Sequence, residues 1–268
     1  MGNSSVNTMV AGARHSVVAL VAAAALLGGC ATNDTGAAEV WDPVEVPNRF
    51  IFSINRAIDI IAIRPVTVLY KEWTPAGAQR GIHNVLDNLG EPVTAINEVV
   101  QGDPSRAVTT LARFLVNSTL GIAGLFDVAT PLGLPRTKEG AGNTIGLYAG
   151  VEPENGGPYL VLPLAGPSNA RDAAGLLADY AVDPFRILTV ALNVDSLLYS
   201  GPKYAATVLD TRSRTMYALD DLEKNSVDYY AALRSAYTQQ RAEVIRKKRE
   251  KTDSRGELDR RDNLALVR

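Results

Sequence analysis

The chain has 268 residues, one cysteine and two histidines, and its formal net charge at pH 7 is −2. A single cysteine excludes a disulfide framework, and the sequence contains no Gly-x-Ser-x-Gly elbow, Walker loop, dinucleotide fingerprint or Cys/His cluster. These absences argue against an enzyme, and we expect no metal, no cofactor and no nucleic-acid partner.

Residues 1–29 have the features of a lipoprotein signal peptide. An uncharged run rich in Ala, Leu and Val, residues 16–27, follows Arg14 and leads into Gly28-Gly29-Cys30. The run is too short for a membrane-spanning helix, which needs about 20 apolar residues. We therefore expect cleavage before Cys30, acylation of Cys30 and a lipidated tether over residues 30–40. The alternative is an ordinary signal peptide with a chance cysteine.

An acylated Cys30 predicts that the protein works at a bilayer surface. Each buried methylene contributes about 0.8 kcal/mol, so two or three acyl chains hold a protein on its membrane durably. Ala31 follows the cysteine, whereas an aspartate there typically retains lipoproteins in the inner membrane of enterobacteria. We therefore expect a lipid anchor on the periplasmic face of the outer membrane.

The body, taken as residues 41–241, opens with an amphipathic helix from Asn48. Isoleucines recur on one face at spacings of three and four residues. They are Ile51, Ile54, Ile58 and Ile61. We assign the first three of them to lipid contact, with plain core packing as the alternative. Pro65 is expected to end or kink this helix and to open a short one.

Three further prolines predict the starts of helices, because proline suits the first helical turn. The predicted helices cover residues 75–89, 92–100 and 104–117, and Gly102-Asp103 supplies a breaker and an N-cap for the last. The uncharged stretch 114–126 has 13 residues. It is too short to cross a hydrocarbon core of about 30 Å.

Residues 121–166 are rich in glycine and proline and lack helical periodicity, which predicts loops. Within them, residues 159–162 are bounded by prolines and predict a short extended segment. Glycine tolerates backbone angles closed to other residues, and hinges need such positions. Five glycines are candidates for a mobile lid or hinge: Gly142, Gly146, Gly150, Gly156 and Gly157. The alternative is a static loop whose glycines fit tight turns.

Helical texture returns from Ser168 and continues, with a break before Asp195, toward the end of the chain. The acidic run beginning at Asp220 resembles a capped entry to a final helix that reaches at least Arg246. Residues 242–268 are predicted to be a charged, flexible tail, since residues 241–268 hold ten Lys/Arg against six Asp/Glu. Contact with anionic headgroups is the alternative to a solvated helix end.

Two single residues stand out in the body. His83 lies in a helical stretch beside Asn84 and Asp87, where a role on the polar face or at a cap is favoured over catalysis. Lys203 is the one cation between Arg186 and Arg212, in an apolar, tyrosine-bearing stretch. It is a candidate for contact with a lipid headgroup, and a snorkelling surface lysine is the alternative.

Polar and glycine signatures recur in a fixed order along the body. They include Asp42-Pro43, Asn48-Arg49, Asn88-Leu89-Gly90-Glu91-Pro92, Arg113-Phe114, Asn117, Asp127, Gly157-Pro158-Tyr159, Arg171-Asp172 and the run from Asp228 to Tyr237. The ordered set, from about residue 42 to 241, resembles the VacJ/MlaA family of outer-membrane lipoproteins. Two departures stand against it: residues 149–156 form a longer turn than the family has, and Tyr229 replaces a proline.

The resemblance implies an all-α, ring-like, monotopic body in the inner leaflet of the outer membrane, with an amphipathic channel. Family members remove phospholipids from the outer leaflet and pass them to a soluble periplasmic carrier, often while bound to trimeric porins. Two alternatives remain open. One is a structural, porin-associated lipoprotein that moves no lipid, and the other is a lipid-modifying hydrolase that uses Ser, Asp and perhaps His83.

Overall fold

The computed structural model describes residues 40–149 and 156–266, with side chains as far as residue 254. The chain divides into Met1–Glu39 and Val40–Arg268, and every described helix and strand belongs to the second unit. The predicted signal peptide, Cys30 with nearly all of the tether, and Gly150 lie outside the described residues.

Helices form nearly all of the regular structure in the described residues, which confirms the predicted all-α class. The first half contains α2 (Glu45–Ile58), the π-helix η1 (Asp59–Ile63), α3 (Arg64–Trp73), α4 (Ala76–Val100) and α5 (Pro104–Thr119). The second half contains α6 (Ala141–Tyr148), α7 (Ala170–Val182), α8 (Pro184–Ala191), α9 (Leu197–Asn225) and α10 (Tyr229–Leu266). An antiparallel hairpin, β1 (Tyr159–Leu162) and β2 (Gly166–Asn169), lies between α6 and α7 and includes the predicted extended segment.

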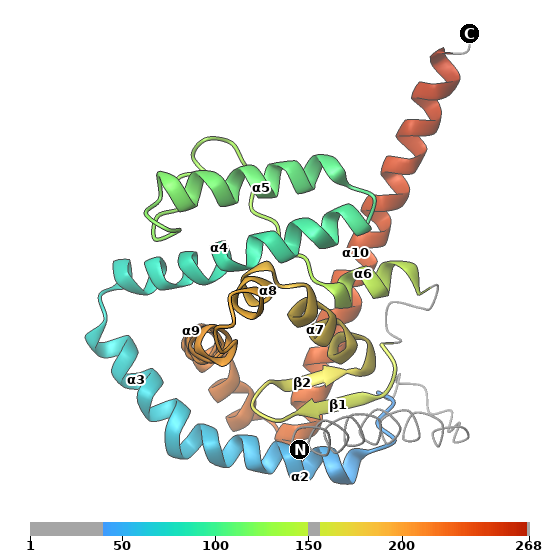
Figure 1. Cartoon of the computed structure of the whole chain (residues 1–268). Coiled ribbons are helices and arrows are strands. Elements are labelled where there is room, and N and C mark those ends of the chain that lie inside the picture. Colours follow the sequence, from blue (N-terminus) through green and yellow to red (C-terminus); the bar gives the residue numbers. More distant parts are fainter. Residues whose placement is uncertain (1–39, 150–155, 267–268) are drawn as a thin grey trace, which may run out of the picture. The chain divides into compact units, whose positions relative to one another are not determined.

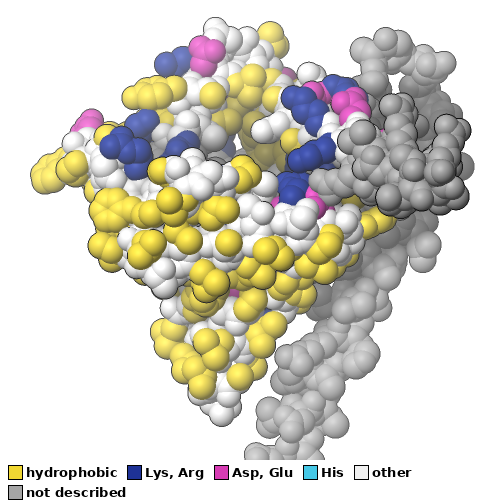
Figure 2. Space-filling model, turned by 90° about the horizontal axis from the view of Figure 1, so that it is seen from above, with side chains coloured by type: hydrophobic (Ala, Val, Ile, Leu, Met, Phe, Trp, Pro, Cys, Tyr) yellow, Lys and Arg dark blue, Asp and Glu magenta, His cyan; other side chains and the backbone are white. Residues whose placement is uncertain are grey.

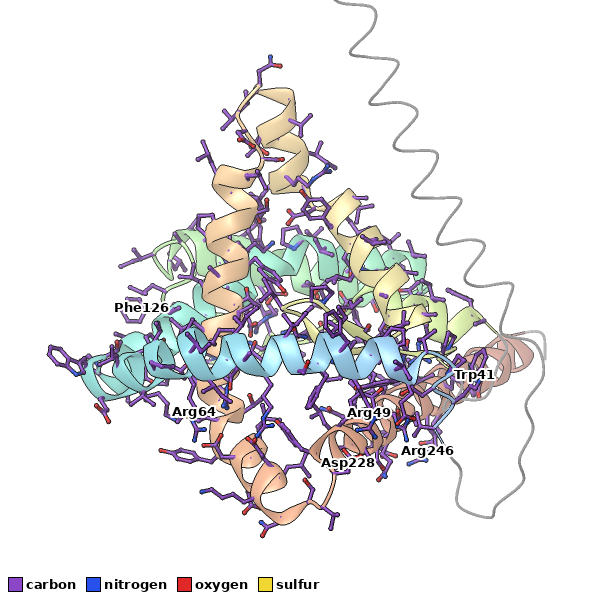
Figure 3. All side chains as sticks on the ribbon, turned by 90° about the horizontal axis from the view of Figure 1, so that it is seen from below. Trp41, Arg49, Arg64, Phe126, Asp228 and Arg246 are labelled. Atoms are coloured by element: carbon purple, nitrogen blue, oxygen red, sulfur yellow. The ribbon has the colours of Figure 1, made fainter. Side chains whose placement is uncertain are left out.

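The helices from α2 to α5 form a curved layer, and α9 crosses it. Figure 1 shows α2, α3, α4 and α5 lying across the view and curving round α8 and α9, with α9 viewed end-on. In Figure 3 the hairpin of α8 and α9 lies on one side of this layer and the turn between α9 and α10 on the other. The curvature agrees with the predicted ring-like bundle.

The sequence predicts that Pro65 ends or kinks the first helix and opens a short one. α3 does begin at Arg64 with Pro65 in its first turn, but it follows α2 without a break, through η1. Proline lacks the N–H of the helical ladder, and its ring clashes with the carbonyl four residues back. The π-turn Asp59–Ile63 lies just before the proline and widens the helix there. The helix therefore continues past Pro65, although the proline nitrogen donates no hydrogen bond.

Pro92 was predicted to open a new helix, and this is wrong, because it lies inside α4. A proline in a helix interior costs about 3 kcal/mol. Bonds to α5 on both sides of it hold α4 together. Before the proline, Asn88 Nδ2 donates to Ser118 Oγ at 2.9 Å. After it, Thr110 Oγ1 donates to Glu98 Oε2 at 2.6 Å.

The strand hairpin is fixed to α2 by two asparagines that act like a third strand. Asn48 donates to the Tyr159 carbonyl at 2.8 Å and accepts from the Val161 N–H at 2.9 Å. Asn55 donates in the same way to the Leu162 carbonyl at 2.9 Å. A small core forms behind these bonds from Tyr159, Val161 and Tyr230, with Ile51 and Phe52 packed against it.

The final helix begins later than predicted. The acidic run at Asp220 lies inside α9, and α10 begins after Asp228, whose carboxylate accepts a backbone N–H three residues on at 3.2 Å. Asp220 pairs with Arg64 at 2.7 Å and with Arg212 at 3.3 Å. The Asp220 carboxylate therefore takes part in ion pairs and does not cap a helix.

The predicted flexible tail is helical and packed where it is described. Ile245 is fully buried, Lys248 pairs with Glu139, and Arg249 Nη2 donates to the Gly146 carbonyl at 2.8 Å. The residues just after 242 therefore pack against α6 and against the segment that precedes it. The charge count of the tail did not indicate these contacts.

Contacts between the start of α2, with the residues just before it, and the start of α10, with Asp228 before it, close the fold. Tyr230 donates a short hydrogen bond to Asp42, and Arg234 Nη1 lies 3.0 Å from the same carboxylate. Arg49 Nη2 lies 2.6 Å from Asp228 Oδ2, and Figure 3 shows these two side chains on neighbouring elements. The first and last helices of the body are thus joined by charged and polar groups.

Candidate lipid-contact surface and polar interior

The described part of the chain buries mainly polar side chains and exposes many large apolar ones. Eighteen polar or charged residues are buried there, against eight hydrophobic ones. Soluble proteins bury aliphatic side chains and rarely bury Glu, Asp or Arg. The exposed apolar side chains gather on α2 and α3, on α5 with the loop after it, and on α8 and α9. This distribution suits a body whose outer faces lie in an apolar medium.

The outward face of α2 to α3 differs from the predicted isoleucine stripe. Its most exposed apolar side chains are Val46, Phe50, Ile61 and Trp73. Ile54 is 38% exposed and Ile58 is half-buried, so both remain candidate lipid contacts. Ile51 packs against the Tyr159 core and is a core residue. The isoleucine spacing found the helix but not the boundary between its inner and outer faces.

A second apolar surface covers α5 and the loop that follows it. Its members are Val108, Leu111, Leu115, Leu120, Ile122 and Phe126. Figure 2 looks onto this side from above and shows hydrophobic side chains spread across the middle of the face. Ile122 has a φ of 52°, which is unfavourable for a β-branched residue. The loop from Asn117 to Gly124 is closed by a hydrogen bond from the Gly124 N–H to the Asn117 carbonyl at 2.8 Å, and within it Ile122 is 66% exposed.

Between α4 and α5 lies a buried network of charged groups. Arg113, with no exposed surface, contacts Glu91 at 3.1 Å and Asp127 at 3.2 Å. Glu98 is equally buried and accepts from Thr110 at 2.6 Å. Burial raises the pKa of Glu91, and the bond from Arg113 opposes this. These groups stabilise the layer from inside while its outer face stays apolar.

The charged groups of α9 tie it to α3, α4 and η1. His83 Nδ1 lies 2.8 Å from Asp210, and His83 Nε2 lies 3.3 Å from Asp87. Arg212 makes two bonds to Asp59, at 2.8 and 2.9 Å. With a carboxylate at each ring nitrogen, His83 has the polar-face role that the sequence favours.

Lys203 is bound inside the fold, at the base of the α8–α9 hairpin. Its ammonium lies 2.7 Å from Asp183 Oδ2 and 2.8 Å from the Tyr199 hydroxyl. Burial disfavours the charged ammonium, but these bonds outweigh that effect and raise the pKa of Lys203. Two of its three donors are used, so headgroup contact through the third remains a proposal.

Two of the candidate hinge glycines serve helix packing. Gly142 and Gly146 lie in α6, where a Cβ on Gly142 would meet Asp172 at 2.7 Å and one on Gly146 would meet Ile245 at 2.7 Å. Both positions are therefore sites of close approach rather than hinge points. Gly157 has a φ of +81°, which favours glycine. Gly156 is also a site of close approach, because a Cβ there would meet the Asn169 side chain at 2.4 Å. The hinge proposal is left with Gly157 and with Gly150, which lies outside the described residues.

No group of three or more His, Cys, Asp or Glu side chains in the described ranges is placed to hold a metal ion. Within the same ranges, none of the helices combines the length and the apolar character needed to cross a bilayer.

Known proteins resemble this chain in sequence and in fold. The family model described as MlaA lipoprotein matches residues 40–244. The chain belongs to the MlaA lipoprotein family. The "Intermembrane phospholipid transport system lipoprotein MlaA" of Escherichia coli K12 is 34% identical over 225 residues, covering 82% of this chain and 85% of that protein. The protein of the same name from Shigella flexneri matches to the same extent.

The chain is also similar to an uncharacterized Rickettsia conorii protein and to a solved structure. The Rickettsia protein is 38% identical over 209 residues, covering 76% of this chain and 78% of its own. The solved structure is described as the structural basis for maintenance of bacterial outer membrane lipid asymmetry. It aligns with a TM-score of 0.64 and 33% identity, covering 76% of this chain and 98% of that one. The family match ends near the point where α10 passes Ile245.

Sequence reasoning missed the pairing inside the MlaA-like body. Glu91 and Arg113 stand among the sequence signatures, but without a structural role. A signal was present, because the polar residues Asn88, Glu91, Thr94 and Glu98 recur on one face of α4 at spacings of three and four. A polar stripe of that kind, on a helix with exposed valines, indicates a helix that turns its polar face inward.

Proposed function

We propose that this lipoprotein takes part in intermembrane phospholipid transport. In this proposal it removes phospholipids from the outer leaflet of the outer membrane and passes them to a soluble periplasmic carrier. The observation that carries the proposal is the inverted burial, with charged groups inside the α2–α5 layer and apolar groups outside it. The names of the MlaA relatives and the description of the matching structure support the same activity.

A phospholipid needs an apolar wall for its chains and a polar path for its headgroup, since a charged group in hydrocarbon is costly. The polar groups on the inner faces of α4 and α9 supply candidates for that path, and Lys203 is one of them. The body lies in the inner leaflet, held by its acylated Cys30 and by its own apolar faces. A trimeric porin is the proposed neighbour within the bilayer. No catalytic step is required.

The experiment uses the full-length protein in its own membrane. A phospholipid with a photoactivatable acyl chain is supplied, crosslinked and identified by mass spectrometry on the mature protein, and neighbouring proteins are identified from the same sample. In parallel, a deletion strain is scored for outer-leaflet phospholipid. We expect lipid crosslinked to the body and a rise in outer-leaflet phospholipid that the wild-type copy reverses.

An abundant outer-membrane lipoprotein processed by the lipoprotein signal peptidase serves as the matched control for crosslinking. A porin recovered without crosslinked lipid, together with unchanged lipid asymmetry in the deletion strain, would favour the structural, porin-associated alternative. A change in the acyl-chain profile of the supplied lipid would favour a hydrolase.

A further inference from the structure

The hairpin formed by α8 and the first turns of α9 carries exposed apolar side chains on both of its helices. They are Ile187, Leu188, Val190, Leu192, Val194, Leu197 and Leu198. From Ile187 to Pro202 the sequence has one charged residue, Asp195. A soluble partner that docks on a helix covers one side of it. A helix that is apolar all round belongs in a protein core or in lipid.

The hairpin extends well beyond the α2–α5 layer. The layer holds α9 at Asp210, through His83 at 2.8 Å, and at the Ser213 carbonyl, through Lys71 at 3.0 Å. The 14 residues from Leu197 to Asp210 correspond to about 20 Å of helix. Figures 1 and 3 show that α9 runs across the layer rather than along it. The layer also contacts the start of α8, where the Phe185 ring lies 6.1 Å from the Phe114 ring of α5, and the hairpin extends away from the layer beyond this contact.

Charged side chains lie toward the opposite end of α9. In Figure 3 the labelled Arg49, Arg64, Asp228 and Arg246 lie along or beyond α2, on the side away from the hairpin. In Figure 2 the Lys and Arg side chains on the visible face lie in its upper part, and the tapered lower end is apolar or uncharged. The described body thus has one end rich in charged side chains and one end, the tip of the hairpin, where Asp195 is the one charged residue from Ile187 to Pro202.

We propose that the α8–α9 hairpin inserts into the hydrocarbon core, crosses the bilayer midplane and contacts acyl chains of the outer leaflet. One leaflet has about 15 Å of hydrocarbon, which is less than the length of α9 beyond Asp210. The carboxylate of Asp195 opposes insertion, but the gain from burying one or two large apolar side chains is of the same order, and the hairpin has seven. This inference rests on the proposed function, since it assumes that the layer lies in the inner leaflet.

Depth is measured by fluorescence quenching in proteoliposomes that hold the full-length, mature lipoprotein. Single cysteines labelled with bimane replace Leu192 or Leu198 at the tip, Leu115 on the layer, and Val227 in the α9–α10 turn. Wild type sets the background, because Cys30 is its one cysteine. Quenching lipids with a nitroxide near the chain end are placed in one leaflet at a time, and iodide reports contact with water.

We expect the tip labels to lose fluorescence when the quencher is in the leaflet opposite the anchor, and to be protected from iodide. Leu115 labels should respond to the anchored leaflet alone, and Val227 labels to iodide alone. Asp195→Asn should increase the quenching at Leu192. Retained helical content, measured by circular dichroism, shows that each labelled variant is folded.

Tip labels quenched by iodide, or quenched in the anchored leaflet alone, would overturn the proposal. The crosslinking of phospholipid to unlabelled wild type is a separate readout of the proposed function. A shallow hairpin with lipid crosslinked to the body would reject deep insertion and keep lipid transport. A deep hairpin without crosslinked lipid would keep deep insertion and reject lipid transport.

Discussion

Single buried charges decide whether the interior of this protein is stable. Arg113 has no exposed surface and contacts Glu91 and Asp127. Removing one partner of a buried ion pair leaves the other without compensation and costs about 3–5 kcal/mol. We expect Arg113→Met to lower the free energy of unfolding by about this amount, measured by urea titration in detergent micelles.

The exposed Arg80 provides the matched control, since Arg80→Met changes the same atoms on a solvated surface. Combining Arg113→Met with Glu91→Leu should recover part of the loss, because the uncompensated carboxylate is then gone. Equal stability of Arg113→Met and wild type would contradict the buried pairing.

A pH effect is expected at the Asp228 carboxylate. The hydrogen bond from Arg49 holds the pKa of Asp228 below its usual range. A carboxylate with a lowered pKa in the folded state adds stability above its unfolded pKa of about 3.9, and this is lost as the pH falls through the folded pKa. Both side chains are about two fifths exposed, so the contribution is below about 1 kcal/mol.

Asp228→Asn should therefore lower the free energy of unfolding slightly at pH 7 and leave it unchanged in strong acid. Unfolding curves at the two pH values, for wild type and the variant, measure this difference. The same loss at both pH values would assign it to the helix cap and not to the charge.

The role of Lys203 can be separated from its ion pair. Lys203→Met alone leaves Asp183 buried without its cation, so the informative variant combines it with Asp183→Asn, which keeps a good helix cap. If Lys203 meets headgroups, the double variant keeps its unfolding midpoint and loses lipid asymmetry, while Lys203→Arg keeps both. Normal asymmetry in the double variant would remove Lys203 from the site.

At the scale of elements, the packing of α6 against α7 depends on glycine. A Cβ on Gly175 would lie 2.2 Å from the backbone nitrogen of Gly142. Gly175→Ala should therefore separate the two helices and destabilise the protein by at least the 1–3 kcal/mol, roughly, of ordinary overpacking. At Gly90, in α4, a Cβ meets nothing within 4 Å, and alanine there should raise stability by up to about 1 kcal/mol.

Thermal unfolding of the two alanine variants in the same micelles compares them directly. Two variants of equal stability would show that α6 moves away from α7 easily, and would return Gly142 to the hinge candidates. A bulky side chain at Gly146 would not test the hinge, because Ile245 and Arg171 already lie close to that glycine.

Local signals in the sequence predicted the helices well where they act alone. The Asp103-Pro104 pair gave the start of α5, where the Asp103 side chain accepts the Arg106 N–H. The predictions were wrong where contacts between residues distant in sequence determine where a helix begins or ends. Pro92 stays inside α4 because α5 makes hydrogen bonds to α4 before and after it. Asp220 forms ion pairs with Arg64 and Arg212 and does not cap a helix.

The candidate site was less predictable than the fold, because its polar groups pair across the layer. Glu91 and Arg113 are 22 residues apart, and no local pattern specifies their contact. The apolar surface was half predicted: the isoleucine spacing identified α2, but a pattern with period 3.6 does not say whether its stripe faces lipid or the core. Ile51 and Ile61 share that stripe and differ in outcome.

For the whole molecule, attachment to the membrane is expected to depend on Cys30. We predict that Cys30→Ser prevents acylation and cleavage by the lipoprotein signal peptidase, which leaves an unprocessed form or a soluble periplasmic one. Mass spectrometry of the mature N-terminus and fractionation of membranes measure the outcome. Wild-type protein without acyl groups on Cys30 would contradict the anchor.

The contact between α2 and α10 also bears on how the protein folds. Asp42 meets Tyr230 across 188 residues of chain, and Arg234 across 192. Contacts so distant in sequence form late in folding, whereas helix pairs such as α4 and α5 form early from neighbouring segments. The apolar outer faces are therefore assembled before the chain is closed, and such partly folded species aggregate readily. The yield of refolding is then set by competition between closure and aggregation, and it should fall as protein concentration rises.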